Sequence, residues 1–292
     1  MTHGTIVAAF GRQYEVLRDD TGETTRCFPR AKKSNFACGD RVAIAAAGDV
    51  IDELLPRRNL LYRADAFKEK LIAANLTQVV IVVATEPGFN DELITRCLCA
   101  AESQDIQALI VLNKCDLSDS LPLAREALRP FAEIGYPVLE LSAKEDVSAL
   151  RERLQGEISL LVGQSGMGKS TLTNALIPEA QAATREISTV LDSGKHTTTH
   201  ARLYKLPEGG ALIDSPGLQV FGLAQLGTGE LEASFREIRE LLGTCRFRDC
   251  GHAKEPDCAV LQAVAQGRMH PRRHKTLLAL LAEKRASITA LY

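Results

Sequence analysis

A glycine-rich turn near the middle of the chain limits the possible folds more than any other feature. The stretch GQSGMGKST at residues 163–171 follows the apolar run ISLLV, and the segment TLTNALI from residue 171 onward has the composition of a helix. Glycines let successive backbone N–H groups turn toward phosphate oxygens, and the N-terminus of the following helix adds its dipole. This strand, turn and helix predict a phosphate-binding loop in an α/β domain, rather than an ordinary glycine-rich turn.

The residue types of this loop predict separate roles in holding a nucleotide. Lys169 has the length and charge to reach the β and γ phosphates, and the Ser170 hydroxyl suits Mg²⁺, a hard cation that prefers oxygen. We expect the whole loop to contact the nucleotide, namely Gly163, Gln164, Ser165, Gly166, Met167, Gly168, Lys169, Ser170 and Thr171.

A second acidic motif follows the phosphate loop. The run GALIDSPG at residues 210–217 reads as a strand that ends in Asp214, whose carboxylate is placed to hold Mg²⁺ directly or through water. Gly217 is predicted to donate its backbone N–H to the γ-phosphate. A D-x-x-G motif alone also reads as a plain turn, and its position after the phosphate loop favours the functional interpretation.

The polar segment GKHTTTH at residues 194–200 lies between these two motifs. Its composition suits a switch loop that is ordered by the γ-phosphate and Mg²⁺. Either Thr198 or Thr199 is predicted to supply a second hydroxyl to the metal, and the sequence does not choose between them. A solvated threonine-rich loop is the alternative interpretation.

A guanine-recognition motif, NKCD at residues 113–116, precedes the phosphate loop. The Asp116 carboxylate would accept hydrogen bonds from a donor pair that guanine has and adenine lacks, so an ATP-dependent enzyme is disfavoured. The strand ALIVL before the motif and LSAK at residues 141–144 support this interpretation over a polar turn. We expect a GTP or GDP site that includes Asn113, Lys114, Cys115, Asp116, Ser142 and Ala143, with the Ala143 N–H donating to the guanine carbonyl.

The order of these motifs is a cyclic permutation of the usual one, with the base-recognition loop first. Such a permutation is physically allowed because the ends of a domain often lie close together, so its packed sheet can survive.

Apolar runs alternate with helical segments from residue 76 onward, which predicts a parallel sheet covered on both faces. Short alternating runs before residue 58 predict an antiparallel barrel of the OB type, although an SH3-like barrel has the same periodicity, and PRRN at residues 56–59 is expected to be a linker.

With these motifs in place, the chain resembles the ribosome small-subunit-dependent GTPase A family (RsgA, also called YjeQ or EngC), which are circularly permuted GTPases. The resemblance implies an OB-type barrel at residues 1–60, a permuted P-loop GTPase domain at 61–225 and a helical zinc-binding domain at 226–292. It also implies GTP hydrolysis that is stimulated by the small ribosomal subunit, late in assembly of that subunit. The flanking domains would bind its rRNA, and other assembly factors are further possible partners.

Three of the eight cysteines form a cluster with a histidine near the C-terminus. Cys245, Cys250, His252 and Cys258 have the residue types of a tetrahedral Zn²⁺ site with no open position, and separate buried thiols are the alternative. The resemblance strengthens the zinc interpretation. Several cations surround or follow the cluster and are candidates for phosphate contacts or for a solvated face: Arg246, Arg248, Lys254, Arg268, Arg272, Arg273 and Lys275.

The residue that would orient the attacking water is not evident from the motifs. Many GTPases place a glutamine directly after D-x-x-G, and Leu218 occupies that position here. We therefore expect His196 in the threonine-rich segment to take this role, beside Lys169 and Asp214. A nucleic-acid-binding scaffold in which the nucleotide is only structural is the competing hypothesis, and multiple turnover would distinguish the two.

The overall composition sets broader limits. The 292 residues are 45% hydrophobic and 25% charged, as in folded proteins, and the net charge of −2 argues against adhesion to nucleic acid over the whole surface. The sequence shows neither a secretion signal nor an apolar run long enough for a bilayer. We expect a cytoplasmic monomer without membrane contact.

Overall fold

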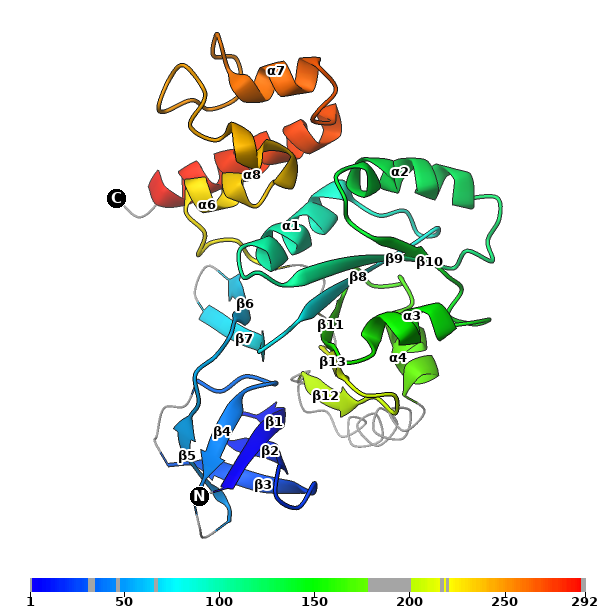
Figure 1. Ribbon diagram of the computed structural model, residues 1–292, viewed down its shortest axis with the longest axis vertical. Helices are drawn as coiled ribbons and strands as arrows, with labels where there is room; N and C mark the ends of the chain where they lie inside the picture. The colour runs from blue at the N-terminus through cyan, green and yellow to red at the C-terminus, as the bar shows by residue number, and fades with distance from the viewer. Residues whose placement is uncertain are drawn as a thin grey trace, which may run out of the picture.

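The computed structural model describes residues 2–30, 35–45, 48–65, 68–177, 201–215, 218 and 221–289. A small barrel comes first, a sheet with helices on both faces follows, and a group of helices ends the chain. Figure 1 shows the barrel at the bottom, the helix-covered sheet on the right and the C-terminal helices at the top. Among the described residues, no helix is both long and apolar enough to cross a membrane.

The N-terminal strands close into a five-stranded barrel. β1 pairs with both β2 and β4, β2 pairs with β3, β3 runs parallel to β5, and β5 pairs with β4, so the ring is complete. Alternate side chains point inward and form a small core that includes Ile6, Val16 and Ile44. This closure is the OB-type arrangement that the sequence predicted. The strands are β1 (Thr2–Phe10), β2 (Gln13–Arg18), β3 (Thr24–Pro29), β4 (Arg41–Ile44) and β5 (Val50–Leu54).

The segment expected to be a linker is fixed by hydrogen bonds. The Arg57 guanidinium donates to both oxygens of the buried Asp40 carboxylate, at 2.7 and 2.6 Å. Asn59 forms a pair of side-chain bonds with the backbone of Leu76, at 2.8 and 2.9 Å. A hairpin that the sequence analysis did not predict, β6 (Leu60–Asp65) and β7 (Lys68–Ala74), is the segment between Asn59 and Leu76. The barrel is therefore attached to the next sheet by a bonded connection.

The central sheet has the order β10-β9-β8-β11-β13-β12, and its first five strands are parallel. β12 runs antiparallel to β13, and its other edge pairs with β1 of the barrel. The sheet thus continues from the helix-covered domain into the barrel. Its strands are β8 (Gln78–Ala84), β9 (Gln107–Asn113), β10 (Val138–Glu140), β11 (Ile158–Val162), β12 (Arg202–Lys205) and β13 (Ala211–Asp214).

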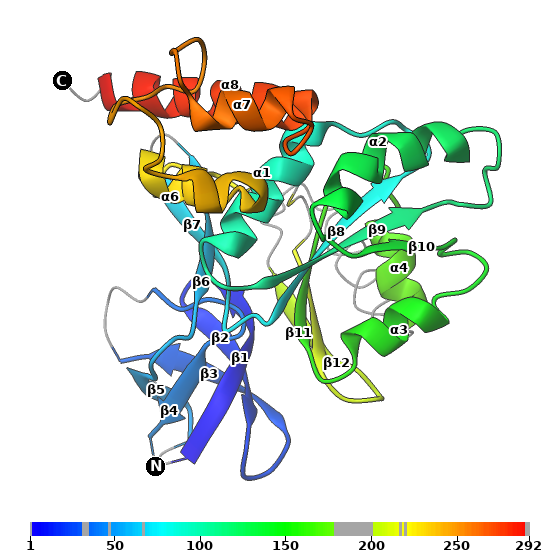
Figure 2. The same ribbon diagram turned by 45° about the horizontal axis from the view of Figure 1, so that its top comes forward.

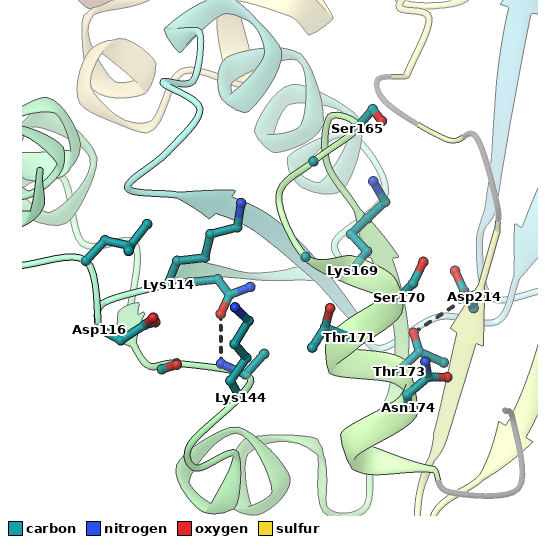
Figure 3. A pocket seen from close by; sticks show the side chains of 16 residues that line it. Lys114, Asp116, Lys144, Ser165, Lys169, Ser170, Thr171, Thr173, Asn174 and Asp214 are labelled. Atoms are coloured by element: carbon teal, nitrogen blue, oxygen red, sulfur yellow. Dashed lines mark hydrogen bonds between the residues drawn. The ribbon is translucent and has the colours of Figure 1, made fainter.

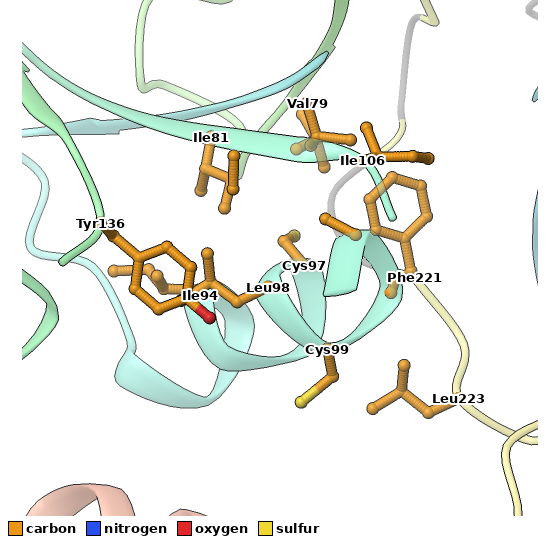
Figure 4. Packing of buried hydrophobic residues seen from close by; sticks show 14 of the residues in the cluster. Val79, Ile81, Ile94, Cys97, Leu98, Cys99, Ile106, Tyr136, Phe221 and Leu223 are labelled. Carbon is orange, nitrogen blue, oxygen red and sulfur yellow. The ribbon is translucent and has the colours of Figure 1, made fainter. Parts of the chain in front are cut away.

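The two faces of this sheet pack against different helices. All seven residues of β8 are buried, as expected for a strand with helices on both sides. Its odd-numbered residues, such as Val79 and Ile81, contact the cluster beneath α1 (Asp91–Glu102) and α2 (Leu121–Glu133). Figure 4 shows Ile94 and Leu98 of α1 in this layer. The even-numbered residues face α3 (Ser148–Leu154) and α4 (Lys169–Leu176).

The C-terminal helices pack on α1 and α2, as Figure 2 shows from a second direction. Arg273 connects the two parts: it donates to Glu237 at 2.7 Å and to Thr95 of α1 at 2.7 Å. Its guanidinium also lies over the rings of Phe131 and Phe235. With only 2% of its surface exposed, Arg273 is a packing residue, so its proposed availability for phosphate contacts is wrong. The elements are α6 (Thr228–Ala233), the 3₁₀ helix η1 (Arg236–Leu241), α7 (Ala259–Ala265) and α8 (Pro271–Thr289).

Candidate nucleotide-binding site and metal centre

The glycine-rich loop leaves β11 and enters α4, as the sequence predicted. Gly168 has a φ of 92°, and a Cβ there would lie 2.2 Å from Nδ2 of Asn113, so only glycine fits. The Lys169 ammonium donates to the carbonyl oxygens of Gly163 and, at 2.8 Å, of Gln164. Burial lowers the pKa of Lys169, and the nearby Asp214 carboxylate raises it. The loop therefore holds one partly buried cation beside a row of backbone groups.

Asn113 joins the base-recognition loop to the phosphate loop. Its Nδ2 donates to the Met167 carbonyl oxygen at 2.9 Å, and its Oδ1 accepts from the Ala143 N–H at 2.9 Å. Three loops that lie far apart in the sequence thus meet at one buried amide. The Ala143 N–H is already bonded in this conformation, so a guanine carbonyl would compete with Asn113 for it.

The next residue, Lys114, has a φ of 61° and extends along the rim of the site. Its ammonium donates to the Glu86 carbonyl oxygen at 2.7 Å, and the Thr85 hydroxyl donates to the Lys114 carbonyl oxygen at 2.9 Å. These contacts fix the base-recognition loop against the end of β8.

The acid of D-x-x-G lies beside helix α4. Asp214 ends β13, and its Oδ2 accepts a hydrogen bond from the Thr173 hydroxyl at 3.4 Å. Figure 3 shows Asp214 on the same side of the site as Ser170. Burial raises the pKa of Asp214, whereas the Thr173 hydroxyl and the Lys169 ammonium lower it. A hydroxyl and a carboxylate in this arrangement are ligands that Mg²⁺ prefers.

One cavity of about 820 Å³ connects all these loops. Its volume lies within the usual range for small-molecule sites. The lining includes four residues that the sequence analysis did not assign to the site, namely Leu117, Thr173, Asn174 and Lys144, the last residue of LSAK. The predicted residues that line it are Asn113, Lys114, Asp116, Ser142, Ala143, Ser165, Gly166, Gly168, Lys169, Ser170, Thr171 and Asp214.

The C-terminal cluster brings Cys245, Cys250, His252 and Cys258 together, with their donor atoms within 4.8 Å of one another. The sulfurs of Cys245 and Cys258 are 3.9 Å apart, close to the roughly 3.8 Å between two thiolates on one tetrahedral Zn²⁺. His252 turns Nδ1 toward these sulfurs, at 3.7 and 3.4 Å, and Nε2 toward Glu232 at 3.3 Å. The donor set and its spacing therefore fit zinc.

The loop of this cluster is shaped by a carboxylate outside the ligand set. Glu255 accepts backbone N–H bonds from Gly251, Ala253 and Lys254, each at 2.9 Å. Because these bonds favour the charged form, the pKa of Glu255 falls to about 2. The loop is thus held in a turn that points His252 inward.

A family model described as RsgA GTPase matches residues 54–224, more than half of the chain. The chain belongs to the RsgA GTPase family. The protein named small ribosomal subunit biogenesis GTPase RsgA from Burkholderia pseudomallei (strain K96243) is 54% identical over 287 residues, which cover 96% of this chain and 91% of the relative. The protein of the same name from Paraburkholderia phytofirmans is 54% identical over 292 residues, covering 96% and 92%.

Solved structures agree with this assignment. The crystal structure of YjeQ from Thermotoga maritima matches with a TM-score of 0.75 at 31% identity, covering 97% of this chain and 98% of the other. The structure of YloQ, described as a circularly permuted GTPase, matches with a TM-score of 0.74 at 27% identity, covering 98% and 96%. The permutation predicted from motif order is confirmed, and this RsgA-family chain is a GTP hydrolase.

Several predicted site residues lie apart from the cavity. The Cys115 thiol donates to the Leu112 carbonyl oxygen at 3.2 Å, and Met167 is buried with its carbonyl oxygen bonded to Asn113. Gly163 and Gln164 present their carbonyl oxygens to Lys169. The other predicted residues, His196, Thr198, Thr199 and Gly217, lie outside the described part of the chain.

The residue after D-x-x-G is described and is informative. Leu218 is only 4% exposed and belongs to the large hydrophobic cluster that also contains Phe221 and Leu223. Leu218 is therefore a core residue of this RsgA-family chain. The Leu218 side chain has no polar atom with which to orient a water molecule.

Proposed function

We propose that the cavity binds GTP, with the base beside Asp116 and the phosphates in the glycine-rich loop. The observation that carries this proposal is the Asn113 amide, which bonds to both Met167 and Ala143. These bonds fix the base-recognition loop relative to the phosphate loop. In this arrangement the Asp116 carboxylate accepts from the guanine donor pair. Lys169 exchanges its two carbonyl contacts for phosphate oxygens, which are stronger acceptors.

The chain's own residues would stabilise the reaction mainly by positioning and charge. Mg²⁺ would be held by Ser170, Asp214 and one of Thr198 or Thr199, and it supplies charge neutralisation at the phosphates. Gly217 would donate its N–H to the γ-phosphate. We assign His196 to orient the attacking water, because Leu218 is buried and has no polar group. His196→Ala that kept full stimulated turnover with unchanged GTP binding would remove this assignment.

We further propose that the small ribosomal subunit is the partner, as the names of the relatives indicate for those proteins. In this proposal the chain is a cytoplasmic monomer with a barrel at residues 1–60, a GTPase domain at 61–225 and a zinc-binding domain at 226–292. The first and last of these domains contact rRNA. Arg246, Arg248, Lys254, Arg268 and Lys275 remain candidates for phosphate contacts. Arg272 is less suited, because its guanidinium donates to Asp91 at 2.6 Å and to the Ala127 carbonyl oxygen at 3.1 Å.

Zinc is proposed as a structural ligand of Cys245, Cys250, His252 and Cys258. The C-terminal elements are short apart from α8, so a metal can replace apolar burial in holding the loop between η1 and α7. With four protein ligands the ion would have no open position for substrate.

Turnover of GTP and ATP, with and without purified small subunits, tests the function as a whole. We expect GTP turnover that rises with added subunits and little ATP turnover. Asp116→Asn should weaken GTP binding and shift the preference toward xanthine nucleotides, because the amide then matches xanthine in place of guanine. Asp119→Asn, a neighbouring change in the same loop outside the cavity lining, serves as the control. Unchanged guanine preference in Asp116→Asn would refute the base assignment.

A further inference from the structure

The barrel contributes to the edge of the nucleotide domain through β12. This strand has only four residues, and a strand this short is weakly held at the edge of a sheet. Here its outer edge pairs with β1, where Ala8 is opposite Arg202. Leu203 of β12 also belongs to the same hydrophobic cluster as Val7 of β1. The position of β12 therefore depends on the barrel.

Four residues form one row across the four neighbouring strands. Glu15 of β2 is opposite Ala8 of β1, Ala8 is opposite Arg202 of β12, and Arg202 is opposite Asp214 of β13. Residues directly opposite one another in a sheet project their side chains to the same face. Arg202 thus lies between two carboxylates, Glu15 on the barrel and Asp214 at the end of the nucleotide domain.

The guanidinium of Arg202 is bound to the barrel side of this row. Its Nη2 lies 3.0 Å from Oε2 of Glu15, and Ala8 stands between the two residues in the row. The Glu15 side chain is 19% exposed and that of Arg202 is 36% exposed, so the pair is only partly solvated. The guanidinium also lies 6.0 Å from the ring centre of Tyr204. Asp214 keeps its Oδ2 on Thr173, next to Ser170, and does not form an ion pair with Arg202.

We propose that Glu15 is a positioning residue for GTP hydrolysis, because it holds the Arg202 guanidinium away from Asp214 and leaves that carboxylate available to Mg²⁺. Opposite residues of an antiparallel pair have Cβ atoms roughly 5 Å apart, which an arginine side chain easily spans. Without Glu15, Arg202 would pair with Asp214 and compete with the metal. The inference rests on the proposed role of Asp214 as a magnesium ligand.

The test is the Mg²⁺ concentration that gives half-maximal binding of a fluorescent, non-hydrolysable GTP analogue to the full chain, with GTP turnover followed over the same Mg²⁺ range. Glu15→Gln should raise this concentration about three- to tenfold, the range that one partly buried ion pair can contribute. Glu15→Gln combined with Arg202→Gln should restore the wild-type value, since the competing cation is gone. Arg202→Gln alone should not raise it. Asp19→Asn is the matched control, because it breaks the exposed barrel pair with Arg41 far from Asp214.

If the Glu15–Arg202 pair is only structural, the result is different. The variant with both Glu15→Gln and Arg202→Gln then needs at least as much Mg²⁺ as Glu15→Gln alone. That outcome, or a raised requirement in Arg202→Gln, would overturn the proposal. Ala8→Val supplies a second route if Glu15→Gln does not fold, because added bulk between the two residues should also release the Arg202 guanidinium from Glu15 and raise the requirement. Asp214→Asn distinguishes failure of the magnesium-ligand role of Asp214 from failure of the positioning role of Glu15. If Asp214→Asn leaves the Mg²⁺ dependence unchanged, Asp214 is not a magnesium ligand. If Asp214→Asn changes it and Glu15→Gln does not, only the positioning role of Glu15 is refuted.

Discussion

Asn113 and Gly168 touch so closely that a Cβ on Gly168 would lie only 2.2 Å from Nδ2 of Asn113. The base-recognition loop and the phosphate loop therefore meet at a position that only glycine allows. This contact explains how motifs separated by a long stretch of sequence form one site. The Asn113 amide is buried and uses both of its polar atoms on the neighbouring loops. Its contribution is therefore to the relative placement of the base and phosphate subsites.

Asn113→Ala should weaken both GTP and GDP binding, since it leaves the Met167 carbonyl oxygen and the Ala143 N–H without their partner. Two buried groups that lose a hydrogen bond cost about 2 kcal/mol or more, which is roughly thirtyfold in affinity. Titration with a fluorescent guanine nucleotide measures the change. Asn90→Ala is a suitable control, because Asn90 caps α1 by accepting from the Glu92 N–H and its loss should affect stability alone. Equal nucleotide affinities for the two variants would contradict the bridging role.

Leu218→Gln should not create the water-orienting glutamine of other GTPases. Leu218 is packed among apolar side chains, so an amide there is either buried at a cost of about 1–3 kcal/mol or forces the segment out of the core. We expect a lower melting temperature and no increase in kcat. Leu218→Met, which conserves volume and polarity, should behave like the wild type. A higher kcat in Leu218→Gln with unchanged stability would show that position 218 can reach the substrate.

The parts of the site with fixed spacing and special backbone requirements were predictable from the sequence. Gly168 and Lys169 belong to a loop whose chemistry needs those residue types at those intervals, and Asn113 and Asp116 belong to another. Their order along the chain was sufficient to predict the permuted domain. Alternating apolar residues in the first strands likewise predicted the barrel, because a period of two matches the pleat.

Features that depend on tertiary contact were not predictable. Arg273 looked like one cation of a basic run, and only the approach of α1 and η1 shows that it is buried on Glu237. Thr173 and Asn174 of α4 line the cavity because this helix lies beside the end of β13, which no motif encodes. The β6–β7 hairpin lies between the predicted linker at residues 56–59 and the alternating pattern from residue 76, where no element was predicted, and its two strands pair with each other. The row from Glu15 to Asp214 depends on pairing between two domains.

Arg273→Met should strongly destabilise the contact between the C-terminal helices and α1. Both members of the Arg273–Glu237 pair are only 2% exposed, and removing one partner leaves an uncompensated buried charge. Loss of one partner of such a pair costs about 3–5 kcal/mol. Urea unfolding followed by circular dichroism measures this loss. The double variant with Glu237→Leu should recover part of it, because no buried charge remains.

The exposed pair of Arg129 and Glu126 provides the comparison for this prediction. These side chains are 56% and 62% exposed, so Arg129→Met should change stability by no more than about 0.5 kcal/mol. If Arg273→Met and Arg129→Met had similar free energies of unfolding, the buried pair would not be the element that docks the C-terminal helices.

Glu232→Gln should weaken zinc binding by the C-terminal cluster. The Glu232 carboxylate lies 3.3 Å from Nε2 of His252 and so fixes the ring with Nδ1 toward the sulfurs of Cys245 and Cys258. Carboxylates that orient a histidine ligand typically contribute about 10- to 100-fold in metal affinity. Competition with a chromophoric chelator measures the affinity directly, without an activity assay. Glu240→Gln, an exposed change in the adjacent 3₁₀ helix, should leave it unaltered. Equal zinc affinities in the two variants would mean that the ring is held by its backbone alone.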